Sequence, residues 1–173
     1  MRFLLFSLFF TLWHDMASAK DFRLPVGKPT AMLTVTDDWR PEETPRGLQA
    51  QTKDGEVALT VAASADAKEM ASIIDEADAR LKARKVTLDR STRQDHKFKI
   101  NGLPAEELTY QGRDNAGPVI VVFTFVTVKD AALVFTYWAT REGDQLHQTE
   151  VGAMFDSIKV LNPSTAASPA PKP

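Results

Sequence analysis

Residues 119–140 read VIVVFTFVTVKDAALVFTYWAT, and this stretch decides the fold. It contains two predicted strands, Val119–Val128 and Ala132–Thr140, which are joined by a short turn at Lys129-Asp130. Both alternating faces of each strand are apolar, so both faces must be covered by other parts of the chain. Strands joined by a short turn are antiparallel. We therefore expect an antiparallel sheet with a covering layer on each side.

Two segments with helical periodicity can supply that cover. The first spans residues 66–85 and begins with a capping box, in which Asp66 is the N-cap and Glu69 lies three residues later. Its apolar residues recur at helical spacing: Met70, Ile73, Ile74, Ala77 and Leu81. The second spans about 143–158 and carries Val151, Met154, Phe155 and Ile158. The predicted fold class is α+β, an antiparallel β-sheet sandwiched between helices.

The rest of the domain is less regular. Leu48–Lys53 and Glu56–Ala63 flank Asp54-Gly55, a dipeptide that favours a two-residue hairpin turn. Ala31–Val35 predicts another short strand. Val86–Ile100 is mostly polar, and we interpret it as a loop.

Basic residues crowd the last turns of the first predicted helix: Arg80, Lys82, Arg84 and Lys85. Positive charge at this end complements the helix dipole. A phosphate-binding patch is the alternative interpretation, and a solvated helix end is the one we favour.

The N-terminus has the pattern of a secretory signal peptide. Arg2 precedes the apolar run Phe3–Trp13, and Ala17-Ser18-Ala19 follows as a small-x-small cleavage site. The apolar run is shorter than the roughly 20 residues that a membrane-spanning helix needs. We therefore predict a signal peptide over residues 1–19, cleaved between Ala19 and Lys20, and a periplasmic or secreted product with no stable membrane span.

The mature product is expected to be one domain with a short tail. Residues 20–161 are about the length of a typical single domain. Residues 162–173 are rich in proline, alanine and serine and contain no large apolar side chain, so we predict a disordered or polyproline-II tail.

Composition excludes several classes of function. The chain has 173 residues, 21 Lys+Arg against 23 Asp+Glu, and a net charge of −2, which argues against a nucleic-acid binder. It contains no cysteine, which excludes thiol catalysis, thiolate metal sites and a lipid-anchored cysteine.

Motifs for catalysis and metal binding are missing from the sequence. After signal cleavage two histidines remain, His96 and His147, and no serine lies in a Gly-x-Ser-x-Gly setting. Two groups contain a histidine and carboxylates: Asp144, His147 and Glu150, and Asp89, Asp95 and His96. Neither group matches a metal-binding motif such as His-Glu-x-x-His. We predict no catalytic residue, no metal site and no cofactor.

Trp39 and Arg40 are the candidate binding residues. They lie in a polar segment that includes Asp38 and Pro41. Packing of Trp39 across one end of the sheet is the favoured interpretation, because exposing so much apolar area is costly. An exposed Trp39 would instead be a candidate hot spot for a partner.

The chain resembles the PsbP-like superfamily, which includes extrinsic photosystem subunits, Mog nuclear-transport factors and DcrB-like bacterial envelope proteins. The matching segments are Phe22-Arg23-Leu24-Pro25, Asp38-Trp39, Gly47, Asn101-Gly102-Leu103-Pro104-Ala105 and Phe155-Asp156-Ser157-Ile158-Lys159. The resemblance implies a non-catalytic α-β-α sandwich that serves assembly or partner binding. The lipid-attachment cysteine of DcrB-like members is missing, and no photosystem role follows from the likeness.

Three hypotheses for function remain. The leading one is an exported, non-catalytic interaction or assembly module of the bacterial envelope with an unidentified protein partner. The alternative is a periplasmic small-ligand-binding protein that uses a cleft between the first helix and the sheet. The third is a hydrolase that uses His96 or His147 with a carboxylate.

Overall fold

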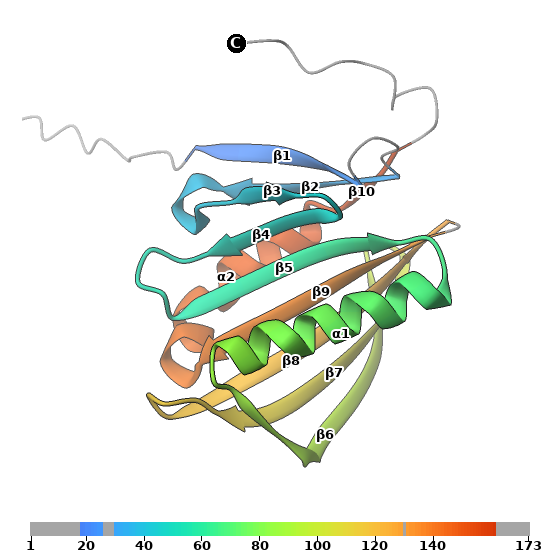
Figure 1. Ribbon diagram of the computed structural model, residues 1–173. Coiled ribbons are helices and arrows are strands. Elements are labelled where there is room, and N and C mark those ends of the chain that lie inside the picture. Colours follow the sequence, from blue (N-terminus) through green and yellow to red (C-terminus); the bar gives the residue numbers. More distant parts are fainter. Residues whose placement is uncertain (1–17, 26–29, 130, 162–173) are drawn as a thin grey trace, which may run out of the picture.

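The computed structural model describes residues 18–25, 30–129 and 131–161. Within these ranges, the main sheet has seven antiparallel strands (Figure 1). Their spatial order is β3 (Glu42–Thr44), β4 (Gly47–Gln51), β5 (Val57–Ser64), β9 (Ala131–Thr140), β8 (Pro118–Val128), β7 (Leu103–Arg113) and β6 (Thr87–Ile100). The two strands that were predicted from residues 119–140, β8 and β9, lie side by side inside this sheet.

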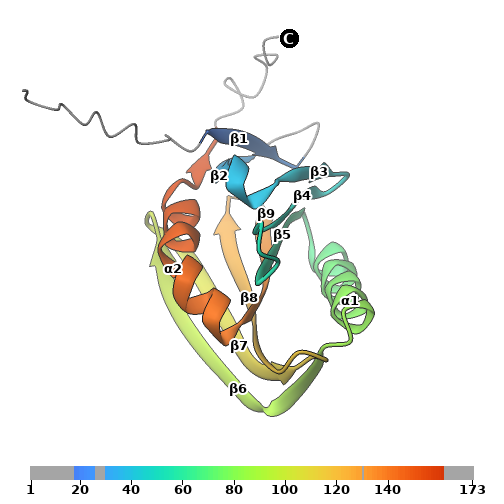
Figure 2. The ribbon, with the colours of Figure 1, turned by 90° about the vertical axis from the view of Figure 1, so that its left-hand side faces the viewer.

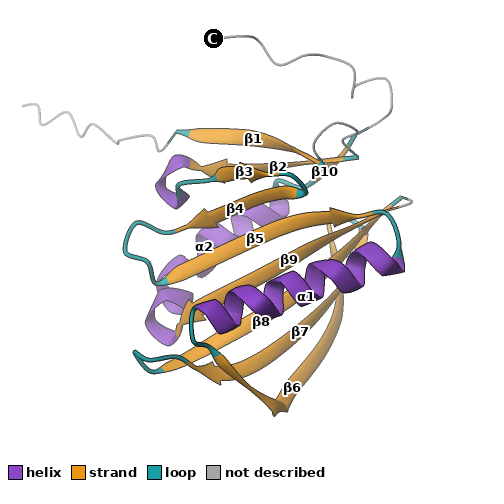
Figure 3. Ribbon diagram, in the orientation of Figure 1, coloured by secondary structure: helices purple, strands orange, loops and turns teal. Residues whose placement is uncertain are grey.

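A smaller sheet lies beyond the β3 end of the main sheet. Its strand order is β1 (Ala19–Leu24), β2 (Ala31–Thr36) and β10 (Lys159–Val160), all antiparallel. A single 3-10 turn, η1 (Asp37–Trp39), follows β2 and leads toward β3. Figure 3 shows how strands dominate the molecule.

One helix covers each face of the main sheet. Figure 2 shows α1 (Ala67–Ala83) and α2 (Arg141–Asp156) on opposite sides of it. A variant of the predicted capping box forms at α1: the side chain of the N-cap Asp66 accepts from the backbone N–H of Glu69, and the carboxylate of Glu69 accepts from the N–H of Ala65, one residue before the N-cap. The prediction of an α+β antiparallel sheet between helices is confirmed.

Two hydrophobic clusters fill the two faces. On the α2 side, Leu133, Phe135 and Tyr137 of β9 are buried with Met154 of α2. On the α1 side, Trp138 of β9 is buried with the helix residues Ala77 and Leu81 and with three residues of β8: Val119, Val121 and Phe123. The apolar pattern on both faces of β8 and β9 therefore reflects two cores.

Two local expectations are wrong. Val86–Ile100 is not a loop, because residues 87–100 form β6 at the open edge of the sheet, with a bulge between Asp89 and Gln94. Most of β6 is exposed, so its sequence lacks the alternation of apolar and polar residues from which a strand is predicted. The β4–β5 connection is also longer than two residues: Thr52 bonds to Val57 across its base, and only Gly55 has a positive φ, at 81°.

The predicted signal peptide and the predicted tail lie at the two ends of the chain. Most of the predicted signal peptide, residues 1–17, and the predicted tail, residues 162–173, lie outside the described residues. The predicted cleavage point falls just inside β1, after its first residue, Ala19. No helix in the described part of the chain is long and apolar enough to span a membrane.

Candidate functional site

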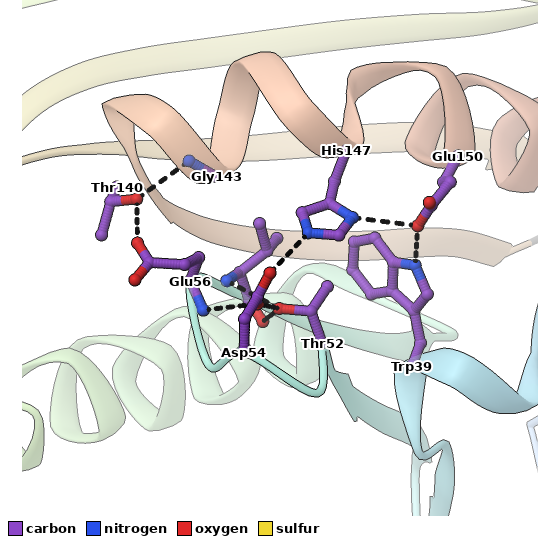
Figure 4. Close-up of polar contacts among 9 residues, drawn as sticks. Trp39, Thr52, Asp54, Glu56, Thr140, Gly143, His147 and Glu150 are labelled. Carbon is purple, nitrogen blue, oxygen red and sulfur yellow. Dashed lines mark hydrogen bonds and ion pairs between the residues drawn. The ribbon is translucent and has the colours of Figure 1, made fainter.

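A chain of polar contacts joins the β4–β5 loop to α2 and to Trp39 (Figure 4). His147 lies at its centre, with Nε2 3.0 Å from Oδ2 of Asp54 and Nδ1 3.1 Å from Oε2 of Glu150. The same oxygen of Glu150 accepts from Nε1 of Trp39 at 2.6 Å. The indole of Trp39 packs edge-on against the imidazole, with 5.8 Å between ring centroids. Segments far apart in sequence are thus tied together by one histidine.

Local structure fixes each partner of His147. Glu150 lies three residues after His147 on α2, so both side chains project from the same face of the helix. Asp54 is held within its loop, because its Oδ1 accepts from Oγ1 of Thr52 at 2.5 Å and from the backbone N–H of Glu56 at 3.0 Å. The loop is therefore preorganised to present its carboxylate to α2.

The start of α2 also rests against this loop. Thr140 is the N-cap of α2 and its hydroxyl accepts from the backbone N–H of Gly143. The same hydroxyl donates to the carboxylate of Glu56. A Cβ at Gly143 would lie only 2.7 Å from Cβ of Glu56 and 2.8 Å from its carbonyl oxygen. Glycine therefore allows the close approach of α2 to the beginning of β5.

The electrostatics of the cluster favour a charged histidine. Burial lowers the pKa of His147, but hydrogen bonds to Asp54 and Glu150 and the charges of both carboxylates outweigh it, and the pKa is raised above 6.5. Hydrogen bonds from the hydroxyl of Thr52, the backbone of Glu56 and the ring of His147 lower the pKa of Asp54 to about 2. The raised pKa of His147 and the lowered pKa of Asp54 both indicate that an imidazolium between two carboxylates is favoured.

This cluster is suited to holding elements together rather than to catalysis. Both ring nitrogens of His147 face carboxylates, so an imidazolium there has no free lone pair for use as a general base. Trp39 is fully buried, with 0% of its surface exposed, so its side chain packs inside the protein. The cluster therefore acts as a clamp between the loop, α2 and η1.

The carboxylate groups suggested by the sequence do not converge. Asp144 accepts from the hydroxyl of Tyr137 at 3.0 Å, apart from the pair formed by His147 and Glu150. Burial, followed by the nearby charge of Asp144, raises the pKa of that Tyr137 hydroxyl. On β6, His96 stacks on Phe98, while Asp89 and Asp95 bond to Ser91 and Arg93. Within the described residues, no group of three or more such side chains is placed to hold a metal ion.

A pocket of about 600 Å³ lies on the other face of the sheet, between α1 and strands β4, β5 and β9. Two rows of cross-strand neighbours form its floor: Gln49, Thr60 and Thr136, and beside them Gln51, Ala58 and Trp138. Its helical wall is formed by Ala77, Arg80, Leu81, Ala83 and Arg84. Helical cover of this face is therefore incomplete, because α1 leaves a hollow over small and polar side chains.

The structure separates the two candidate binding residues. Arg40 is exposed and lines the pocket, whereas Trp39 is buried next to it in the chain. Sequence reasoning named Arg84 only in the phosphate-binding patch that it did not favour, and it missed Trp138 as a pocket residue. The guanidinium of Arg84 lies 5.2 Å from the centre of the Trp138 ring, a cation–π contact. Two signals were available: the basic cluster at the end of the helix, and the aromatic residue on the α1 face of β9.

Comparison with solved structures identifies the architecture. Cyanobacterial PsbP (CyanoP) from Synechocystis sp. PCC 6803 superposes with a TM-score of 0.53 at 10% identity, over 84% of this chain and 94% of that one. The chain has the PsbP-like fold. A protein from Bacteroides thetaiotaomicron VPI-5482 superposes with a TM-score of 0.56 at 10% identity, over 83% of this chain.

The remaining comparisons add no function to the PsbP-like fold. The alignment with the Bacteroides protein covers 48% of that protein, so the chain spans about half its length. LpqN, involved in cell envelope biogenesis of Mycobacterium tuberculosis, superposes with a TM-score of 0.49 at 15% identity, over 83% of this chain and 92% of LpqN. No family model matches the chain, and no curated protein matches it in sequence. At these identities the likeness concerns the PsbP-like fold alone.

Proposed function

We propose that the protein is an exported, non-catalytic binding module of the bacterial envelope, and that it binds a small molecule between α1 and the sheet. The observation that carries this proposal is the pocket of about 600 Å³ in that position. Its volume lies within the range of about 300–1,000 Å³ that is typical of small-molecule sites. The signal-like N-terminus supports export, and the fully engaged His147 supports a role other than hydrolysis.

The described surface favours a pocket over a large apolar docking face. Leu146, on α2, is the one large hydrophobic residue that is exposed in the described ranges, at 66%. Stable protein interfaces usually bury aromatic and aliphatic anchors. The small-ligand function therefore fits the geometry better than a broad hydrophobic interface does.

Thermal-shift screening against sugars, lipids, carboxylates and phosphate esters tests the proposal. A ligand that binds only the folded protein raises the melting temperature. Ala58→Phe fills the pocket floor, and Ala153→Phe adds the same ring to the exposed face of α2 as a control. We expect at least one compound to stabilise the wild type and Ala153→Phe, but not Ala58→Phe. No shift across the panel, or an equal shift in Ala58→Phe, contradicts the proposal.

A protein partner remains a second candidate because β6 has an open edge. This strand of 14 residues pairs with β7 alone among the described strands. Such an edge can accept a strand from another protein. Adjacent residues of a strand point their N–H groups to opposite sides. One of the two variants His96→Pro and Lys97→Pro therefore removes a donor at the open edge, and the other removes a donor to β7.

Pull-down from a periplasmic extract tests this second candidate. We expect the wild type to retain a reproducible partner, and the better-folded of the two proline variants to lose it. Equal capture by that variant argues against docking at the edge of β6. Trp39→Ala would be a poor probe of the surface, because Trp39 is buried.

A further inference from the structure

We infer that the pocket between α1 and the sheet takes a small organic oxyanion, a carboxylate or a phosphate ester with a short apolar body. The inference rests on the proposed function, because it names the ligand class of the same site. Three features carry it: the charged side chains around the pocket, the ion pairs and hydrogen bonds that those side chains already form, and the buried indole N–H of Trp138.

Basic side chains outnumber acidic ones around the pocket. Four basic residues, Arg40, Lys53, Arg80 and Arg84, line it with two acidic ones, Glu42 and Asp54. Positive charge is therefore in excess around the pocket. The sheet closes one side of the pocket, and its low-dielectric wall strengthens the attraction for an anion.

Two of the basic groups already have carboxylate partners outside the pocket lining. Lys53 forms an ion pair with Asp38, and Arg80 forms one with Glu76 at 3.8 Å. In the described part of the chain, Arg40 and Arg84 form no ion pair within 4.0 Å. Arg84 donates to the neutral amide of Gln51 at 3.1 Å. Two guanidinium groups are thus available for an oxyanion.

The acidic residues of the pocket are already engaged. Glu42 accepts from the amide of Gln49 at 2.8 Å. Asp54 accepts within its own loop and lies 3.0 Å from His147. Neither carboxylate forms an ion pair with Arg40 or Arg84 within 4.0 Å.

Trp138 provides an independent sign of a ligand. Its side chain lines the pocket, it is 8% exposed, and its buried indole Nε1 has no hydrogen-bond acceptor among the described residues. Buried donors are almost always paired, so an orphaned one requires an explanation. Nε1 is covered in this structure, so a ligand oxygen would supply the missing acceptor after a small shift of the side chains around the indole.

The floor of the pocket leaves room for the apolar part of the ligand. Ala58 lies directly between Gln51 and Trp138 in the cross-strand row, and its small side chain leaves space beside the indole. Ala77 and Leu81 of α1 line the pocket from above. A short aromatic or aliphatic body fits among these groups, with its oxyanion directed to the arginines.

Titration followed by ¹⁵N NMR tests the inference on the full chain. The indole N–H signal of Trp138, assigned by its loss in Trp138→Phe, reports on the pocket. The probes are phenylacetate, phenyl phosphate and the neutral phenylacetamide. We expect one or both anions to shift this signal, and phenylacetamide to bind at least tenfold more weakly. The anion that binds more tightly shows whether the site prefers a carboxylate or a phosphate ester.

Charge variants provide the matched controls. Arg40→Gln and Arg84→Gln should each weaken binding of the anion about tenfold, whereas Arg141→Gln, at the exposed start of α2, should leave it unchanged. Equal binding of phenylacetamide, or equal weakening by Arg141→Gln, overturns the oxyanion inference while the pocket remains a ligand site. A Trp138 signal that responds neither to these probes nor to any compound of the thermal-shift panel overturns the proposed function as well.

Discussion

His147 shows how one residue can hold a PsbP-like fold together. Its two nitrogens reach Asp54 and Glu150, which come from a loop and a helix 93 and 3 positions away in sequence. Only 13% of the His147 side chain is exposed, whereas Asp54 and Glu150 are 40% and 47% exposed. Solvent therefore screens part of each ion pair, and we expect a moderate contribution to stability.

Replacing this histidine should destabilise the protein in a pH-dependent way. The pKa of His147 is raised in the folded state, so its contribution is complete below about 6.5, the unfolded value, and is lost as pH rises through the folded-state pKa. His147→Gln should cost about 1–2 kcal/mol of unfolding free energy at pH 5.5 and less at pH 9. Urea denaturation of both proteins at the two pH values measures this, and an equal cost at both would contradict the imidazolium clamp.

Acid should release the other side of the clamp. The pKa of Asp54 is lowered from 3.8 to about 2, chiefly by the hydroxyl of Thr52. Its stabilising contribution is therefore present above pH 3.8 and lost as pH falls through about 2. Asp54→Asn should be less stable than the wild type at pH 5, with the difference shrinking toward pH 2. Circular dichroism during acid titration follows this, and a difference that grows toward pH 2 would contradict the assignment.

At the scale of elements, the clearest constraint is the contact of α2 with β5. Gly143 lies against Glu56, where a Cβ would meet backbone and side chain below 3.0 Å. Gly152, further along the same helix, is exposed and has no atom within 4 Å of a built Cβ. The two glycines lie on the same helix and differ strongly in packing, so they can be compared directly.

Alanine should have opposite effects at the two positions. Gly143→Ala should lower the unfolding free energy by about 1–3 kcal/mol, since the added carbon must displace β5 or the helix. Gly152→Ala should raise it by up to about 1 kcal/mol through helix propensity. Thermal denaturation of both variants provides the measurement. A stabilised Gly143→Ala would mean that the helix does not approach β5 as closely as described.

The elements also show what sequence can reveal. Apolar residues on both faces of β8 and β9 predicted two covering layers, because burial leaves a periodic trace. The polar edge strand β6 leaves no such trace, since its exposed residues need not alternate. Asp54 and His147 could not be paired from sequence, because their contact depends on how the β4–β5 loop meets α2. A cleft between the first helix and the sheet was the alternative hypothesis from sequence, but its lining could not be named, because it arises from small residues such as Ala58 lying beneath a helix.

At the scale of the whole molecule, the fold places its two polar features on opposite faces. The clamp secures α2 on one face, and the pocket lies beneath α1 on the other. Both involve the β4–β5 loop, because Asp54 belongs to the clamp and also lines the pocket. The contact between Asp54 and His147 can thus hold one wall of the binding site in place.

Export makes a separate prediction about the whole chain. Removal of residues 1–19 would leave Phe22 and Leu24 of β1 buried in the core and remove only the first residue of that strand. We therefore expect a folded protein that begins at Lys20 in the periplasmic fraction of a Gram-negative host. Intact-mass measurement of that fraction decides the point. Full-length chain confined to the cytoplasm would contradict export.

The most direct test of the binding function is native mass spectrometry after incubation with the small-molecule fraction of a bacterial periplasm. We predict a noncovalent adduct of low mass on the wild type and on Ala153→Phe, and its loss in Ala58→Phe, where the pocket floor is filled. A wild-type protein that emerges without any adduct, or the same adduct on folded Ala58→Phe, would contradict a ligand site between α1 and the sheet.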